Sequence, residues 1–184
     1  MISLTSRVLV VWLQPEKPFS CKHLSVLGRL RNLEELLINL PTNRAVLDVP
    51  ESAAQQPNPA EPYSWLGSLS ALTRLAMSIP TVSGLSSIGS CTNLCSLFLQ
   101  GAVGQGPKLQ LGEAEWDALA HLTKLTSLKV SKGFRAAVVS EACAAAVLRM
   151  GSLEILAGPF WTEDTLQVFS QLPHLGLING CWGA

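Results

Sequence analysis

Apolar residues in this chain recur first at every third position and then at every second position. The pattern is clearest between Trp116 and Gly133, where Trp116, Leu119, Leu122, Leu125 and Leu128 follow steps of three and Val130 follows a step of two. On an α-helix each step of three turns the side chain by about 300°, so these positions would wind around the cylinder. One continuous amphipathic α-helix is therefore excluded. The spacing predicts a short helical or irregular segment, a turn, and a short strand with alternating inward side chains.

The same ladder of five positions at steps of three occurs six times. The six ladders begin at Leu24, Tyr63, Leu85, Trp116, Ala144 and Leu166, and these starting positions differ by 39, 22, 31, 28 and 22 residues. Four ladders continue with the alternating residue of a strand, which is Ile38, Met77, Leu99 or Val130. Gly158 and Gly180 stand there in the last two, so we expect the strands to weaken toward the C-terminus. Short offsets are typical of solenoid coils, and long offsets imply insertions.

Two insertions are predicted between the ladders. Residues 40–62 contain five prolines, a density that prevents regular helix or strand pairing. We expect an exposed loop there, either a tolerated surface insertion or a flexible arm that contacts a partner. Residues 101–112 carry four glycines whose spacing does not match a phosphate-binding loop. They predict a turn-rich connection with a short strand at Leu109 to Leu111.

The N-terminal residues 1–23 contain an apolar run from Val8 to Leu13. This run is far shorter than the roughly 20 residues that span a bilayer. It predicts a first strand, and Val8, Val11 and Leu13 repeat the spacing of the ladder positions Leu33, Leu36 and Ile38. Further along, Ser140 and Thr162 precede acidic residues and are predicted helix N-caps.

Four segments of these ladders, NLEELLIN, ALTRLAMS, NLCSLFLQ and KLTSLKVS, resemble the leucine-rich repeat family, and the resemblance covers about residues 24 to 182. It implies an α/β solenoid of about six to seven repeats in one domain, residues 1–184. The family's horseshoe has a parallel sheet on its concave face and short helices or irregular segments on its convex face. The family usually has Asn or Cys three residues beyond the last leucine of each strand. At matching positions this chain has Ala102 and Gly133, so we expect the coils to stack irregularly.

Composition narrows the classes of partner. Thirteen basic and thirteen acidic residues give formal neutrality, which argues against nucleic acid or an anionic membrane as the partner. Five cysteines, an odd number, fit a reducing compartment, so we expect a cytoplasmic protein. Cys91 replaces a ladder leucine and is predicted to be a small core residue.

The search for catalytic chemistry gives little. His23, His121 and His174 each directly precede a ladder leucine, so the repeat itself explains their positions. No nucleophile-elbow, zinc-protease or paired-cysteine metal motif is present. We therefore expect no enzyme activity, no cofactor and no metal.

The resemblance implies that residues between the inward leucines form rows on the concave face. The expected central row is Trp12, Leu37, Ala76, Phe98, Lys129, Ala157 and Asn179. On one side of it we expect Val10, Glu35, Arg74, Ser96, Ser127, Ile155 and Leu177, and on the other Gln14, Asn39, Ser78, Gln100 and Ser131. Exposed aromatic and aliphatic groups among small polar ones are typical of recognition surfaces. We expect a protein partner to bind Trp12, Leu37, Arg74, Phe98 and Lys129.

Several alternatives stay open at the level of sequence. Neighbouring side chains or an insertion could cover the apolar residues of the central row. The chain could also be the substrate receptor of a ubiquitin ligase or the sensor of an immune-type receptor, as such repeats often are. It could be a structural fragment that self-associates through its C-terminal end. An enzymatic reading through Cys95 needs a His within hydrogen-bond reach.

Overall fold

Seven short strands form one parallel sheet in a computed structural model of the chain. The described residues are 7–12, 21–39, 62–79, 81–101, 109–131, 133–134, 141–158, 169, 171–172, 174–175 and 177–179. The strands are β1 (Val8–Trp12), β2 (Glu35–Asn39), β3 (Arg74–Ile79), β4 (Ser96–Gly101), β5 (Ser127–Val130), β6 (Ile155–Ala157) and β7 (Leu177–Asn179). Each strand pairs in parallel with the one before it in the chain. The predicted α/β class and parallel sheet are confirmed, and the last two strands are short, as expected.

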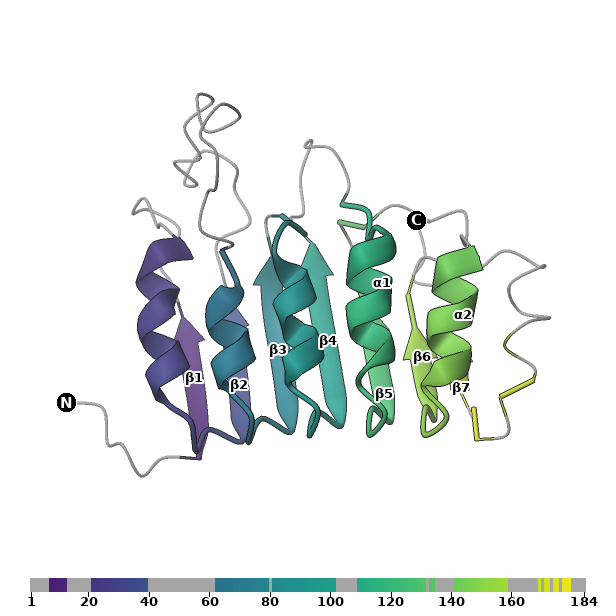
Figure 1. The fold of residues 1–184 in the computed structure, drawn as a ribbon, viewed down its shortest axis with the longest axis horizontal. Coiled ribbons are helices and arrows are strands. Elements are labelled where there is room, and N and C mark those ends of the chain that lie inside the picture. The colour runs from purple at the N-terminus through teal and green to yellow at the C-terminus, as the bar shows by residue number, and fades with distance from the viewer. Residues whose placement is uncertain are drawn as a thin grey trace.

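The described helices all lie on the same side of this sheet (Figure 1). Three are 3₁₀ helices, η1 (Cys21–Arg29), η4 (Ser64–Ser68) and η5 (Leu85–Ser90), and two are α-helices, α1 (Glu113–Ala120) and α2 (Glu141–Arg149). Each packs against the next one along the chain. The molecule therefore has two layers, and the core lies between the sheet and the helices.

Backbone hydrogen bonds explain why the ladders step by three. In the second ladder, the N–H groups of Leu66, Leu69 and Leu72 donate to the carbonyl oxygens three residues earlier, at N–O distances of 2.9, 2.9 and 3.1 Å. In the other ladders the bonds equivalent to that of Leu72 are donated by the N–H groups of Leu33, Leu94, Leu125, Leu153 and Leu175. A 3₁₀ turn contains three residues, so side chains three apart lie one above another on the same face. A step of three is thus a straight stripe in this geometry, although it would spiral around an α-helix.

The ladder residues form the core. Leu66, Leu72, Leu97, Leu122 and Leu128 are fully buried, and the alternating strand residues Ile38, Met77, Leu99 and Val130 are buried with them. Three described ladder residues, Leu30, Ala144 and Leu175, are only half-buried. Leu30 and Leu175 still pack against the core, whereas the prediction for Ala144 was wrong. In α2 the side chain of Ala144 is only half-buried, whereas Cys143, Ala146 and Val147 are buried. The reason is that α2 is α-helical, so its buried stripe follows a period of 3.6 residues.

A repeated contact sets the level at which each strand begins. The carbonyl oxygen of Glu34 accepts hydrogen bonds from the N–H groups of both Thr73 and Arg74, at 2.8 and 3.0 Å, and the Thr73 hydroxyl donates to the same oxygen at 3.0 Å. The same double acceptance recurs at the carbonyl oxygens of Arg7, Thr73, Cys95 and Thr126. These bonds bring equivalent residues of neighbouring strands opposite each other.

The first strand corrects a prediction. Val8 is opposite Glu35, and Leu9 and Val11 are opposite Leu36 and Ile38. The inward residues of β1 are therefore Leu9 and Val11. Of the predicted set, Val11 is inward, Val8 is not, and Leu13 lies outside the described residues. Every position from Val8 to Leu13 is apolar, so periodicity could not decide which side chains point inward.

Close approaches between segments that are distant in the sequence favour glycine at two inner positions. A Cβ atom on Gly89 of η5 would lie 3.0 Å from the carbonyl oxygen of Ala118 in α1. A Cβ atom on Gly101, the last residue of β4, would lie 2.7 Å from the carbonyl carbon of Gly133. Gly133 has a φ of 95°, which favours glycine. Beside it, the predicted strand at Leu109 to Leu111 is a single bridge between Leu109 and Phe134.

Some predictions lie outside the described residues. These include nearly all of the predicted loop 40–62, of which only Pro62 is described, and the predicted N-caps Ser140 and Thr162. Ladder residue Leu166 and family position Ala102 also lie outside them. No helix in the described part of the chain has the length and apolar character needed to cross a membrane.

Candidate functional site

Strand register aligns one residue of every strand in a single row, and the described side chains of this row lie on the face of the sheet opposite the helices. Strand register gives this central row as Val10, Leu37, Ala76, Phe98, Lys129, Ala157 and Asn179. Six of the seven positions agree with the sequence-based row. Trp12 does not belong to it, because Trp12 is opposite Asn39 and so lies in the neighbouring row.

The central row is open at its N-terminal end. Val10 and Leu37 are 49% and 38% exposed, Phe98 is half-buried, and Lys129 is exposed. Ala76 lies between Leu37 and Phe98 and has the smallest side chain of the three. Toward the other end of the row, Ala157 is buried. The accessible part of the row therefore joins aliphatic, aromatic and cationic side chains.

The row that contains Val8 and Arg74 supplies a paired charge. Glu35 and Arg74 are opposite each other, and the Arg74 guanidinium lies 3.3 Å from the Glu35 carboxylate. A second pair, Arg7 and Glu34 at 3.0 Å, lies just before β1 and β2. Among the described residues no carboxylate is within ion-pair distance of Lys129. Lys129, which is opposite Phe98, is thus a cation without an ion-pair partner in the described part of the chain.

The row on the other side is small and polar. The Ser78 hydroxyl donates to the Asn39 side-chain oxygen at 3.3 Å, and Ser78 is only 4% exposed although it points away from the helices. Gln100 is half-buried and is opposite Ser78. Trp12 belongs to this row by register, and its side chain lies outside what the structure describes. Polar groups therefore flank the apolar central row, as at many protein interfaces.

Two of the free cysteines in the described part of the chain are buried. Cys91 and Cys143 are buried, and burial raises the thiol pKa of Cys91 from 9.0 to about 11 and that of Cys143 to about 12. The Cys91 thiol donates to the Leu66 carbonyl oxygen at 3.3 Å, which confirms its predicted place in the core. A raised pKa removes the thiolate that nucleophilic chemistry needs.

Cys95, the remaining free cysteine of the described part, is half-buried. Its thiol contacts the Asn93 carbonyl oxygen at 3.5 Å, whereas the ring of His121 bonds the Asp117 carbonyl oxygen. The described contacts therefore do not pair Cys95 with a histidine base. In the same part of the chain, no three His, Cys, Asp or Glu side chains are grouped closely enough to hold a metal ion.

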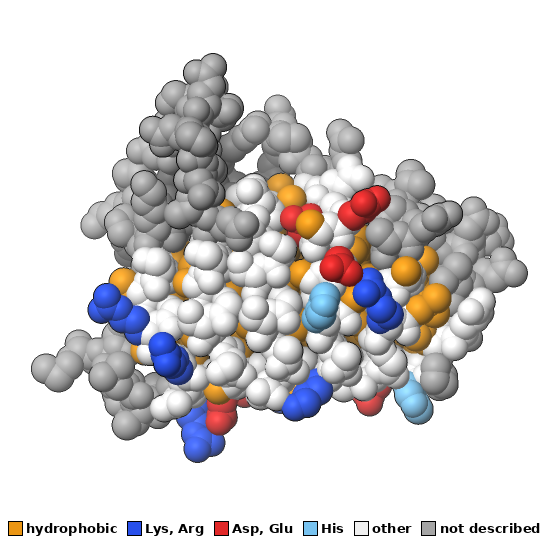
Figure 2. All heavy atoms as spheres, viewed as in Figure 1, with side chains coloured by type: hydrophobic (Ala, Val, Ile, Leu, Met, Phe, Trp, Pro, Cys, Tyr) orange, Lys and Arg blue, Asp and Glu red, His pale blue; other side chains and the backbone are white. Residues whose placement is uncertain are grey.

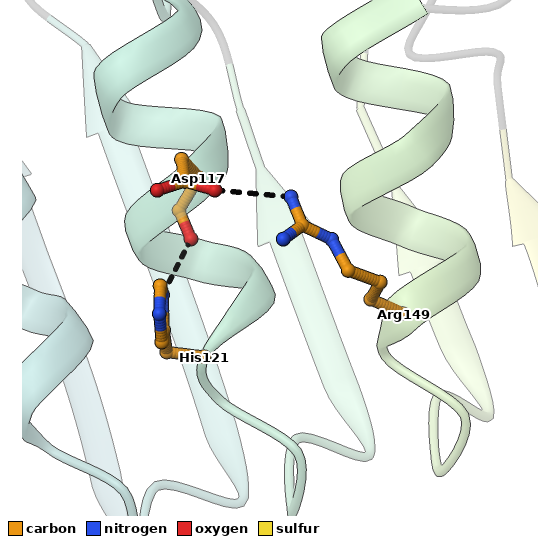
Figure 3. A network of polar contacts seen from close by, with 3 residues as sticks. All are labelled: Asp117, His121 and Arg149. Carbon is orange, nitrogen blue, oxygen red and sulfur yellow. Dashed lines mark hydrogen bonds and ion pairs between the residues drawn. The ribbon is translucent and has the colours of Figure 1, made fainter.

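The opposite face has one cluster of polar side chains. Acidic, basic and histidine side chains lie together over α1 and α2 (Figure 2). In the close view of Figure 3, Arg149 of α2 reaches the Asp117 carboxylate of α1 at 3.1 Å, and Nδ1 of His121 donates to the Asp117 backbone carbonyl at 2.8 Å. The imidazole does not contact the carboxylate, so this is not an acid–base dyad. The contacts tie α1 to α2 and satisfy a carbonyl at the end of α1.

Sequence reasoning missed two features of the sheet face. It did not identify the Glu35–Arg74 pair, although opposite charges at equivalent ladder positions in successive units are a usable signal. It also placed Val10 in the side row and not in the central one. The apolar run around Val10 offered no signal that could correct this.

No protein-family model matches this chain, and neither a curated protein nor a solved structure matches it. The functional argument therefore rests on the residues of the sheet face and on the repeated packing behind them.

Proposed function

We propose that this chain is a leucine-rich-repeat solenoid that binds another protein through its outward sheet face, the concave face of a horseshoe. It acts without a cofactor and without catalysis. The observation that carries the proposal is the central row, in which Val10, Leu37, Phe98 and Lys129 are accessible on β1, β2, β4 and β5. The repeated 3₁₀ turns and strand-entry hydrogen bonds support the repeat architecture behind it.

The physical basis of binding is a preformed surface. Strands β2 to β5 are hydrogen-bonded on both sides, and their inward leucines are buried, so the outward side chains start from fixed positions. Little backbone entropy is then lost when a partner docks. Leu37 and Phe98 supply apolar area, and Lys129 supplies a charge that a partner carboxylate can pair with.

A reducing compartment suits the cysteines. Cys91, Cys95 and Cys143 are free thiols. Cys91, which follows η5, and Cys143 of α2 are buried in different parts of the core. We therefore propose a cytoplasmic location, where thiols stay reduced.

An affinity pull-down with a matched pair of variants tests this function. The test variant is Leu37→Ala with Phe98→Ala on the sheet face, and the control is Leu148→Ala, which removes an exposed apolar side chain from α2 on the helix face. Circular dichroism establishes first that all three proteins are folded. We expect a protein captured by the wild type and the control to be lost from the double variant, with at least a tenfold weaker affinity when remeasured with the purified partner, since hot-spot truncations cost about 2 kcal/mol or more.

Equal capture by the double variant and the wild type would place binding elsewhere on the chain. Loss from the control alone would move the site to the helix face.

A further inference from the structure

Two cations and no carboxylate lie among the described outward residues of the three middle strands, β3, β4 and β5. The outward residues form rows there, because strand register aligns them across the strands. One row contains Arg74, Ser96 and Ser127, and the next contains Ala76, Phe98 and Lys129. The formal net charge of the whole chain is zero, so this part of the sheet face is more basic than the chain as a whole.

Lys129 is the first of the two cations. Its side chain is exposed, and it is directly opposite Phe98 on the neighbouring strand. Its ammonium group makes no ion pair and no hydrogen bond with the described part of the chain. The group is therefore free to pair with a carboxylate of another molecule, one strand away from an aromatic side chain.

Arg74 is the second cation, and its charge is only partly neutralised. One terminal nitrogen of its guanidinium lies 3.3 Å from a carboxylate oxygen of Glu35, and the Arg74 side chain is 69% exposed. Glu35 belongs to β2, so it lies on the side of Arg74 that faces away from β4. A guanidinium has five N–H donors, and the described carboxylates give it no second ion pair. Donors therefore remain for a second carboxylate.

The two cations lie on opposite sides of Phe98. Lys129 is one strand away on β5, and Arg74 is one strand away on β3, opposite Ser96, which comes two residues before Phe98. Neighbouring strands are about 4.8 Å apart, so one docked segment can contact the ring and both cations together. Between the cations, the half-buried hydroxyl of Ser96 offers a further hydrogen-bond donor.

We propose that the partner of this face is an acidic protein segment in which Asp or Glu residues flank a large apolar side chain. The apolar side chain packs on Phe98, and the carboxylates pair with Lys129 and Arg74. Packing on the ring supplies affinity, and the ion pairs around it supply specificity and faster association. This inference rests on the proposed function, because it names the chemistry of the partner at the same face.

The apolar part of the row favours a protein segment over a nucleic acid. Proteins that bind a phosphate backbone neutralise many phosphates with separate cations, whereas the described outward residues of β3 to β5 supply two. Beyond Ala76 the central row continues with Leu37 and Val10, which are 38% and 49% exposed. Apolar area with a few charges around it is typical of interfaces between proteins.

Selection from a library of short random peptides displayed on phage tests the proposal, with the purified whole chain as bait. We expect the enriched peptides to combine acidic residues with a large apolar residue and to contain few basic residues. Lys129→Glu should weaken the binding of a synthetic copy of such a peptide by at least about tenfold, because it sets like charges against each other. The same peptide with Lys in place of its acidic residues should prefer Lys129→Glu to the wild type.

Arg29→Glu is the matched control for the change in charge. It alters the net charge by the same amount at an exposed residue of η1, on the helix side of the sheet (Figure 1). It should leave the affinity for the acidic peptide unchanged. Added salt should weaken the binding of that peptide to the wild type, since salt screens exposed charges. Circular dichroism of each variant separates loss of binding from loss of folding.

Enriched peptides without acidic residues would overturn this inference, and so would an empty selection or equal affinity of an acidic peptide for the wild type and Lys129→Glu. If apolar peptides without acidic residues are enriched and Leu37→Ala with Phe98→Ala abolishes their binding, the inference fails while the proposed function stands. If the enriched peptides bind equally well to that double variant and to Lys129→Glu, both fail.

Discussion

The two faces of the sheet are built from the same strands and have opposite properties. In β4, Leu97 and Leu99 are fully buried against the helices, and Phe98 and Gln100, which alternate with them, are half-buried on the other face. The inward positions hold similar aliphatic residues in every strand, because the inward side chains of one strand pack against those of the next. The outward positions vary from Val and Leu to Ala, Phe and Lys. Stability is therefore concentrated on the inward face, and core packing constrains the residues of the outward face less.

The largest expected effect is the loss of an inward leucine. Leu97→Ala removes a fully buried side chain between the sheet and the helices, and it should lower the free energy of unfolding by about 2–5 kcal/mol. Phe98→Ala, one residue away on the outward face, should cost about 1 kcal/mol or less. Urea denaturation of both variants measures the difference. If Phe98→Ala is the more damaging change, the assignment of the two faces is reversed.

The next effect comes from an inward position that has no side chain. Gly101→Ala places a Cβ atom 2.7 Å from the backbone of Gly133, so one of the two segments must shift. We expect a loss of about 1–3 kcal/mol, as for other overpacked cores. Thermal unfolding measures it, with Gly151→Ala as the control, since a Cβ at Gly151 meets nothing within 4 Å. An unchanged melting temperature for Gly101→Ala would show that the two segments separate easily.

A smaller effect depends on pH and also belongs to the inward face. Burial raises the pKa of Cys91 from 9.0 to about 11, so the folded state keeps a proton that the unfolded state has lost. This contribution is complete below pH 9 and is lost as the pH rises through about 11, with a slope of at most about 1.4 kcal/mol per pH unit. Urea titrations at several pH values between 8 and 11 should show a shallower decline for Cys91→Ala than for the wild type. Equal declines would mean that this thiol ionises normally in the fold.

The smallest effect is expected for the charges of the outward face. The side chains of Arg74 and Glu35 are 69% and 39% exposed, so water and salt screen their attraction. Arg74→Ala should change stability by no more than about 0.5 kcal/mol. A double-mutant cycle with Glu35→Ala isolates the coupling between them. A coupling as large as the cost of Leu97→Ala would show that the outward face also holds the fold together.

Sequence-based predictions succeeded where apolar residues recur at regular spacing and leave only one face for the core. Leu72, Leu97 and Leu128 were correctly placed inside, because each of them continues the regular spacing of apolar residues in its ladder. Most of the outward row followed from the same alternation, including Leu37, Phe98 and Lys129. It failed for Trp12 and Val10, where apolar residues on every position allow two registers and only pairing with β2 selects one.

The ladder spacing did not determine whether a segment forms a 3₁₀ helix or an α-helix; the residues between the ladder positions did. The first three helical segments contain Ser and Gly between their ladder residues and form 3₁₀ turns, whereas α1 and α2 contain Ala and Glu and form α-helices. Ser and Gly have lower helix propensity than Ala and Glu. In α2 the change of period moved Ala144 out of the core and brought in Cys143.

The sequence by itself determined which side chains the core would take and where the strands would lie, because burial depends on spacing along one chain. Only the tertiary structure decided how neighbouring strands and distant segments contact one another. The register of β1, the pairing of Glu35 with Arg74 and the contact of Gly101 with Gly133 all join residues that are at least 27 positions apart. Such contacts depend on hydrogen bonds and close packing between segments that are distant in the sequence. Local periodicity contains no information about them.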